Sequence, residues 1–272
     1  MQALPLAAYF FFLEAAAGGT IALFWVHLRN DVGRGFTLFT GSCLWILGGL
    51  AIWLRFVFPP VAAVELSPTA RLWFAAERTL SLAWLVLLGI YLLGLARTPQ
   101  RLRLLGPLVP LLGLGALWSA ALVDPSQQLF GLGTPLAVLA GALALGSALA
   151  GLSLGHWYLV SPTLSVQPLI RLTFLCLGAI VAQLVLLPIL LVLLPGPRPA
   201  AVQSLFGEYL VLVGVRVIFG LVVPLGATLM TWRTARIRSL DSATGLLYIV
   251  AALVLAGEIA ARTLYFLTGV AT

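Results

Sequence analysis

The amino-acid sequence predicts an all-α fold, a polytopic transmembrane bundle of eight helices with both termini on the outer, periplasmic side. Hydrophobic residues make up 62% of the 272 residues, and charged residues make up only 8%. A soluble domain carries about 25% charged residues, so this chain lacks the polar surface that a soluble fold needs. Its apolar runs are long and continuous, without the alternation of barrel strands, and this pattern favours helical spans.

A transmembrane helix needs about 20 mostly apolar residues. The stretches that meet this length are 5–27, 36–58, 71–96, 104–123, 134–160, 169–195, 205–232 and 243–270. The first six are followed by turn-forming segments, in order NDVGRG, FPP, RTPQR, VDPS, SPTLSVQP and PGPRP. The fourth stretch is the least regular, because Pro107 and Pro110 fall in its first turns. Every connection is short, so residues 1–272 are expected to form a single integral membrane domain.

The distribution of arginine predicts the orientation of these spans. The arginines that follow the odd-numbered spans are Arg29, Arg34, Arg97, Arg101, Arg103, Arg171, Arg233, Arg236 and Arg238. On the opposite side only Arg198 lies in a true loop. Arginine-rich loops stay in the cytoplasm, so both termini are expected outside, in a bacterial cytoplasmic (inner) membrane. The arginines build no basic domain, which argues against a nucleic-acid partner and leaves the lipid bilayer as the expected surrounding.

Charged residues also occur inside the predicted spans, in their central and outer parts. They are Glu14, Glu77, Arg78, Arg216, Glu258 and Arg262. Each costs about 2.5–3.5 kcal/mol at the centre of a bilayer, so these side chains are expected to face the bundle interior and to pair with one another. One interpretation is that the pairs only fix helix packing. The other is that they form a functional site, as intramembrane charges usually do.

Sequence spacing suggests which charges pair. Glu258 and Arg262 are four residues apart and can pair within one helix. The two remaining carboxylates are then expected to meet Arg216 or Arg78. Arg55 ends the second span, where we expect it to snorkel to the interface.

The two histidines suggest a different cofactor. His27 ends the first span and His156 ends the fifth, so both fall at the cytoplasmic interface. Two such imidazoles can be the axial ligands of a b-type haem. Alternatively, each histidine contacts water or a loop carbonyl.

The charged cluster favours a quinone site over a transport path. A quinol gives up two protons on oxidation, and a carboxylate close to the hydroxyl can accept one. Neighbouring arginines keep that carboxylate ionised, and a tyrosine can donate to a quinone oxygen. Tyr265 lies seven residues after Glu258, on the same helix face. A transporter would show polar residues through the whole depth and two related halves, and neither is visible. No metal-ligand motif is present.

Two short stretches carry a resemblance to a known family. The first span reads YFFFLEAAAGGTIALF, and the last carries the pattern E-x-x-x-R-x-x-Y-F. With eight spans and outer termini, the chain resembles the membrane anchor subunits of polysulfide-reductase and dimethyl-sulfoxide-reductase type. The resemblance implies quinone binding toward the outer face and docking of iron–sulfur and catalytic subunits. Its motifs touch only Glu14, Glu258, Arg262 and Tyr265.

We therefore expect a membrane anchor subunit of a respiratory or electron-transfer oxidoreductase complex. It would bind quinone or quinol near the outer leaflet and accept protons there, while the electron carriers lie on partner subunits. One alternative is a subunit that carries haem b on His27 and His156. Another is a non-catalytic structural or assembly subunit, in which the charges serve only packing.

Overall fold

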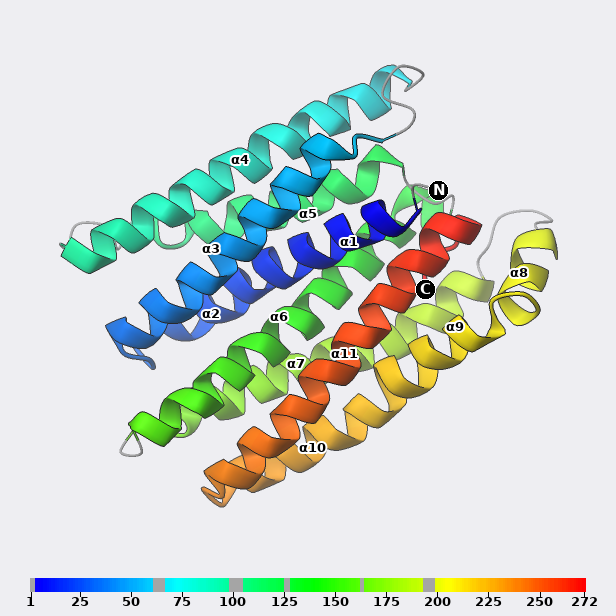
Figure 1. Cartoon of the computed structure of the whole chain (residues 1–272). Helices are drawn as coiled ribbons and strands as arrows, with labels where there is room; N and C mark the ends of the chain where they lie inside the picture. Colours follow the sequence, from blue (N-terminus) through cyan, green and yellow to red (C-terminus); the bar gives the residue numbers. More distant parts are fainter. Residues whose placement is uncertain (1–2, 61–66, 98–104, 125–127, 162–163, 193–198) are drawn as a thin grey trace.

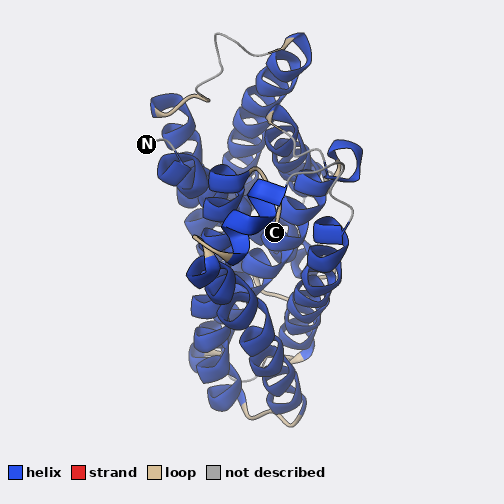
Figure 2. Cartoon of the chain, turned by 90° about the vertical axis from the view of Figure 1, so that its right-hand side faces the viewer, coloured by secondary structure: helices blue, strands red, loops and turns tan. Residues whose placement is uncertain are grey.

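The computed structural model describes residues 3–60, 67–97, 105–124, 128–161, 164–192 and 199–272. Within these ranges the chain forms helices joined by turns and loops, without a strand (Figure 2). Of the arginines used to predict orientation, Arg101, Arg103 and Arg198 lie outside the described ranges. The all-helical prediction is confirmed for the described part of the chain.

The first half of the chain runs back and forth along the bundle. Its helices are α1 (Ala3–Leu13), η1 (Glu14–Gly18), α2 (Gly19–His27), α3 (Arg34–Val57), α4 (Pro68–Arg97) and α5 (Leu108–Val123). The first three follow one another without a break and act as a single long helix. Its middle part, η1, is a π-helix, the wider form in which each N–H bonds five residues back.

The second half continues the same back-and-forth course. Its helices are η4 (Gln128–Gly131), α6 (Gly133–Val160), α7 (Gln167–Val192), α8 (Pro199–Phe206), α9 (Leu210–Gly214), η5 (Val215–Val222), α10 (Val223–Arg236) and α11 (Leu240–Thr268). The segment η5 is also π-helical, so α9, η5 and α10 form one continuous passage. The sequence predicted this passage at 205–232, and the helix instead begins at Leu210 and extends to Arg236.

Seven of the described passages are long and apolar enough to cross a membrane. They correspond to the predicted stretches other than 104–123. In that stretch α5 has 16 residues, about 24 Å at 1.5 Å per residue, against about 30 Å for a hydrocarbon core. The helix is short because it starts only after Pro107, its N-cap. Figure 1 shows α5 running along the bundle beside α4.

The helix α6 lies at the centre of the bundle. It packs against α7, α11, η1, α2 and α5, and its sequence is rich in alanine and glycine. A Cβ built on Gly146 would overlap the backbone of Gly18 in η1, so these two helices approach each other as closely as their backbones allow. Both chain ends lie at one end of the bundle, opposite the turns that follow α2, α6 and α10 (Figure 1).

Candidate functional site

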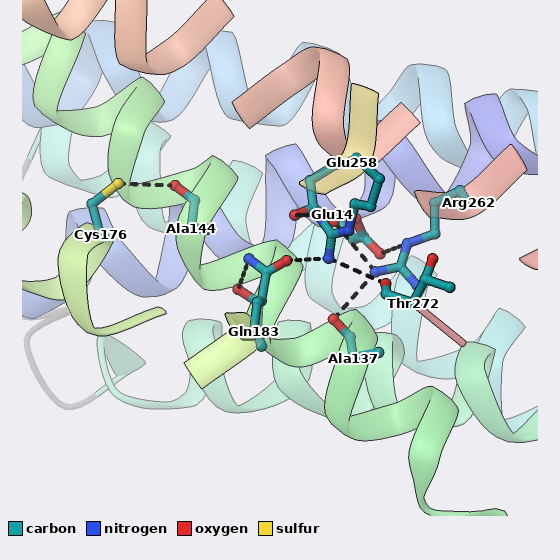
Figure 3. A network of polar contacts seen from close by, with 10 residues as sticks. Glu14, Ala137, Ala144, Cys176, Gln183, Glu258, Arg262 and Thr272 are labelled. Atoms are coloured by element: carbon teal, nitrogen blue, oxygen red, sulfur yellow. Dashed lines mark hydrogen bonds and ion pairs between the residues drawn. The ribbon is translucent and has the colours of Figure 1, made fainter. Parts of the chain in front are cut away.

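The intramembrane charges separate into two networks rather than one cluster. The first, which we call the central network, joins Glu14, Arg216, Glu258 and Arg262 from η1, η5 and α11 (Figure 3). Arg216 Nη1 lies 3.0 Å from Glu258 Oε1, and Arg262 Nη2 lies 3.4 Å from Glu258 Oε2. The predicted pair of Glu258 with Arg262 is therefore confirmed. Glu14 meets Arg262, at 2.7 Å between Oε1 and Nε, so the expectation that it pairs with Arg216 or Arg78 is wrong.

Uncharged groups complete the central network. Arg216 donates to the side-chain oxygen of Gln183 on α7, and its Nη2 also donates to the main-chain oxygen of Thr272 at 3.1 Å. Arg262 Nη2 donates to the carbonyl of Ala137 on α6 at 3.2 Å. The network thus ties α6 and α7 to η5 and α11. Gln183 is a member that the sequence-based reasoning missed, although it is the one amide in an otherwise apolar stretch, LCLGAIVAQLVLLP.

The central network is buried and balanced in charge. Its two carboxylates and two guanidiniums are each at most 1% exposed, so every charge relies on the others to offset its desolvation. The hydrogen bonding is less complete than the charge pairing. Glu14 Oε2, Arg216 Nε and Arg262 Nη1 have no hydrogen-bond partner in the described part of the chain. The Glu14–Arg262 contact is close but poorly aligned, since neither of its two atoms meets hydrogen-bond geometry.

Local backbone features make room for this network. Glu14 opens the π-helix η1 and Arg216 lies in the π-helix η5, and π-turns inside α-helices are frequent at functional sites. Gly141 on α6 faces the Glu258–Arg262 pair, and a Cβ there would lie against Glu258 Oε2 and 3.0 Å from Arg262 Nη2. Two charged groups therefore occupy the space that a side chain at position 141 would need.

The second network, which we call the lateral network, consists of Tyr9, Arg55 and Glu77 from α1, α3 and α4. Arg55 binds Glu77 through two parallel bonds, Nε to Oε1 at 2.7 Å and Nη2 to Oε2 at 2.8 Å. The hydroxyl of Tyr9 donates to Glu77 Oε1 at 2.6 Å. Arg55 is only 7% exposed, so the expectation that it snorkels to the interface is wrong. The carboxylate of Glu77 recruits it into the bundle instead.

A small pocket adjoins the lateral network. Its volume is about 20 Å³, and its lining is Tyr9, Ile52, Arg55, Phe56, Glu77, Arg78, Ser81 and Leu82. The hydroxyl of Ser81 is buried without a hydrogen-bond partner in the described part of the chain. Phe56 and Leu82 are 52% and 42% exposed, so the pocket lies near the outer surface of the bundle.

Arg78, a predicted site residue, lines this pocket without joining the ion pair. Its guanidinium carbon lies 4.8 Å from the ring centre of Phe56, and the side chain is exposed. A guanidinium over an aromatic face is stabilised by the charge distribution of the ring. Glu77 pairs with Arg55, so the expectation that it meets Arg216 or Arg78 is also wrong.

Tyr265 and the two histidines lie outside both networks. The Tyr265 hydroxyl donates to the main-chain oxygen of Asp124, at the end of α5. His27 hydrogen-bonds with Tyr91 through Nε2 at 2.7 Å and with Thr37 through Nδ1 at 3.0 Å. A haem iron on His27 would have to replace one of these partners.

His156 has a separate partner. Its ring nitrogens lie 3.0 and 3.1 Å from the hydroxyl of Tyr248 on α11. Each histidine of the haem alternative is thus hydrogen-bonded to a different tyrosine.

Comparison with known proteins adds no family to this description. No protein-family model matches the chain, and no curated protein matches it. Any functional conclusion therefore depends on the chemistry of the two networks and on the pocket beside Glu77.

Proposed function

We propose that the chain is the eight-span membrane anchor subunit of an oxidoreductase complex and that it takes up quinol at the pocket beside Glu77. In this proposal α5 is a span, both termini face outward, and the membrane is a bacterial inner membrane. One observation carries the quinol site: a buried carboxylate, fixed by Arg55 and Tyr9, lies at a pocket near the bundle surface. In a membrane that surface faces lipid, from which a quinol arrives.

The lining of the pocket suits the chemistry of quinol oxidation. Oxidation releases two protons and two electrons, and a partner subunit that carries an iron–sulfur cluster would take up the electrons. Glu77 accepts the two protons in turn and passes each on to the outer aqueous phase, and the bidentate contact with Arg55 fixes its carboxylate at the pocket. The unpartnered hydroxyl of Ser81 supplies a hydrogen bond to the quinone oxygen.

The size of the pocket determines how a quinol would bind. A volume of about 20 Å³ holds one water-sized group. A quinol hydroxyl would enter it, while the ring would rest on the exposed side chains of Phe56 and Leu82. The central network is closed and internally paired, and we assign it to holding α6, α7, η5 and α11 together rather than to binding quinone.

Binding of a short-tailed quinol to the purified full chain, measured by calorimetry, tests the site without a partner subunit. Ser81→Ala keeps the Arg55–Glu77 pair and should weaken binding about three- to tenfold, the worth of one hydrogen bond. Glu77→Gln should weaken binding more. Glu208→Gln, which changes an exposed carboxylate elsewhere, is the matched control.

Two outcomes would argue against the proposal. Unchanged quinol affinity in folded Ser81→Ala and Glu77→Gln variants would show that this pocket is not the quinol site. Purification through a tag on this chain should also recover an iron–sulfur subunit. If the chain is consistently isolated alone, it is not a subunit of such a complex.

A further inference from the structure

A larger cavity lies at the end of the bundle opposite the chain termini. Its volume is about 350 Å³, and its lining is His27, Leu28, Asn30, Val32, Arg34, Tyr91 and Leu95. These residues come from the end of α2, the turn after it, the start of α3 and the last turns of α4. A water molecule occupies about 30 Å³ of liquid, so the cavity has room for a polyatomic group.

The lining of this cavity combines basic, polar and apolar side chains. Arg34 supplies a positive charge, and the polar side chains of His27, Asn30 and Tyr91 also belong to the lining. Among the described residues, no carboxylate belongs to the lining. Asp31, the acidic residue of the same turn, forms an ion pair with Arg171. The net charge presented to a ligand is therefore positive.

The polar groups of the lining are held in place by the fold. Arg34 donates one N–H to the carbonyl of Ala96 at the end of α4, and a guanidinium has five N–H donors. The imidazole of His27 is fixed on both sides, by Tyr91 and by Thr37. A ligand in the cavity would meet groups that are already oriented, which lowers the entropy cost of binding.

The depth of the cavity places it at the membrane interface. Tyr91 lies six residues before Arg97, the last residue of α4, or about 9 Å along the helix. The headgroup region adds about 5–7 Å on each side of the hydrocarbon core. A lipid headgroup in the cavity would therefore have Arg34, Leu28 and Val32 among its neighbours.

We propose that this cavity binds a phosphate group, with Arg34 as its charged ligand. An anionic phospholipid at the interface is one source of that phosphate, and free phosphate is the other. Arginine suits this role because its planar fork binds phosphate oxygens in pairs. The site is separate from the quinol pocket, which lies toward the opposite ends of α3 and α4.

The test measures ligand retention on the purified full chain by native mass spectrometry. The probes are short-chain phosphatidylglycerol, phosphatidylcholine and inorganic phosphate. Phosphatidylglycerol should bind more tightly than phosphatidylcholine, and Arg34→Gln should weaken its binding about fivefold. Arg34→Lys keeps the positive charge, so it should weaken phosphatidylglycerol binding less than Arg34→Gln does. Arg29→Gln is the matched control. Arg29 belongs to the same turn but does not line the cavity, and its guanidinium carbon stacks on Trp25, 4.7 Å from the ring centre.

A second variant keeps the test decisive if Arg34→Gln is poorly folded. Val32→Trp adds bulk to the lining and leaves every charge in place, so it should weaken binding without altering surface charge. Inorganic phosphate that binds with the same dependence on Arg34 would support the site with free phosphate as its source. Equal losses in Arg34→Gln and Arg29→Gln would overturn the proposal, because they would show only a general attraction to basic loops. Wild-type binding in Val32→Trp would overturn it as well.

Discussion

At the scale of single residues, the central network shows how a membrane chain offsets the cost of buried charge. Glu258 holds two arginines, Arg216 at 3.0 Å and Arg262 at 3.4 Å, and Arg262 also meets Glu14. Each charge contacts at least one opposite charge, so none is left without compensation. The sequence predicted that these charges pair, because lipid cannot solvate them. It could not predict the partners across helices, since depth along a span does not tell which spans are neighbours.

Replacing Glu258 by glutamine should destabilise the folded chain by about 3–5 kcal/mol, the usual cost of removing one partner from a buried ion pair. The physical reason is that Arg216 and Arg262, each 1% exposed, would lose the carboxylate that both contact. Unfolding of the purified chain in detergent, followed by circular dichroism, measures the loss.

Glu208→Gln serves as the control, because this exposed carboxylate should leave the free energy of unfolding unchanged. Equal stability of the Glu258→Gln and wild-type chains would show that the network contributes nothing to folding and would reopen its assignment as a ligand site.

At the scale of elements, the π-helical segments and the glycines beside them determine how the charged helices meet. The segment η5 crosses α11 at Gly220 and Gly257, where a Cβ on Gly257 would overlap Gly220 Cα and lie 3.2 Å from its carbonyl carbon. Gly257 directly precedes Glu258, so this contact brings the carboxylate to Arg216. The sequence contained these glycines, but a glycine in an apolar run does not show which helix it faces. The π-turns have no signature in the hydrophobic periodicity of the sequence, so they could not be predicted from it.

Gly257→Ala should therefore destabilise the bundle by about 1–3 kcal/mol, because the added methyl forces η5 and α11 apart. Gly226→Ala on α10 is the matched control, since no heavy atom lies within 4 Å of a Cβ at that position. It should be neutral or stabilising by up to about 1 kcal/mol, because alanine favours helix. Thermal unfolding of the two variants in the same detergent compares them. Similar melting temperatures would mean that the crossing is not tightly packed.

At the scale of the whole molecule, composition and run length predicted most of the architecture. Seven predicted stretches correspond to helices long and apolar enough to span a membrane, because only continuous hydrophobic helices satisfy both lipid and the backbone. The two networks were predicted less well. Glu77 and Glu258 were grouped by depth along their spans, yet they lie in different networks, since α4 and α11 pack in different parts of the bundle (Figure 1).

The orientation and the eight-span count can be tested together by cysteine labelling. The native cysteines, exposed Cys43 and buried Cys176, are first replaced by serine and alanine. Three single-cysteine variants then report on three exposed positions: Gly33→Cys between α2 and α3, Phe130→Cys between α5 and α6, and Ser242→Cys at the start of α11. A membrane-impermeant maleimide is applied to intact and to permeabilised cells.

The expected pattern follows from the arginines at the end of α10, Arg233 and Arg236, which favour a cytoplasmic turn before α11. Phe130→Cys should be labelled on intact cells, and Gly33→Cys and Ser242→Cys only after permeabilisation. The complete reverse would show that both termini face inward. Labelling of Phe130→Cys under the same conditions as Gly33→Cys would show that α5 does not cross the membrane, because the two spans α3 and α4 return the chain to the side of Gly33 before α5 begins.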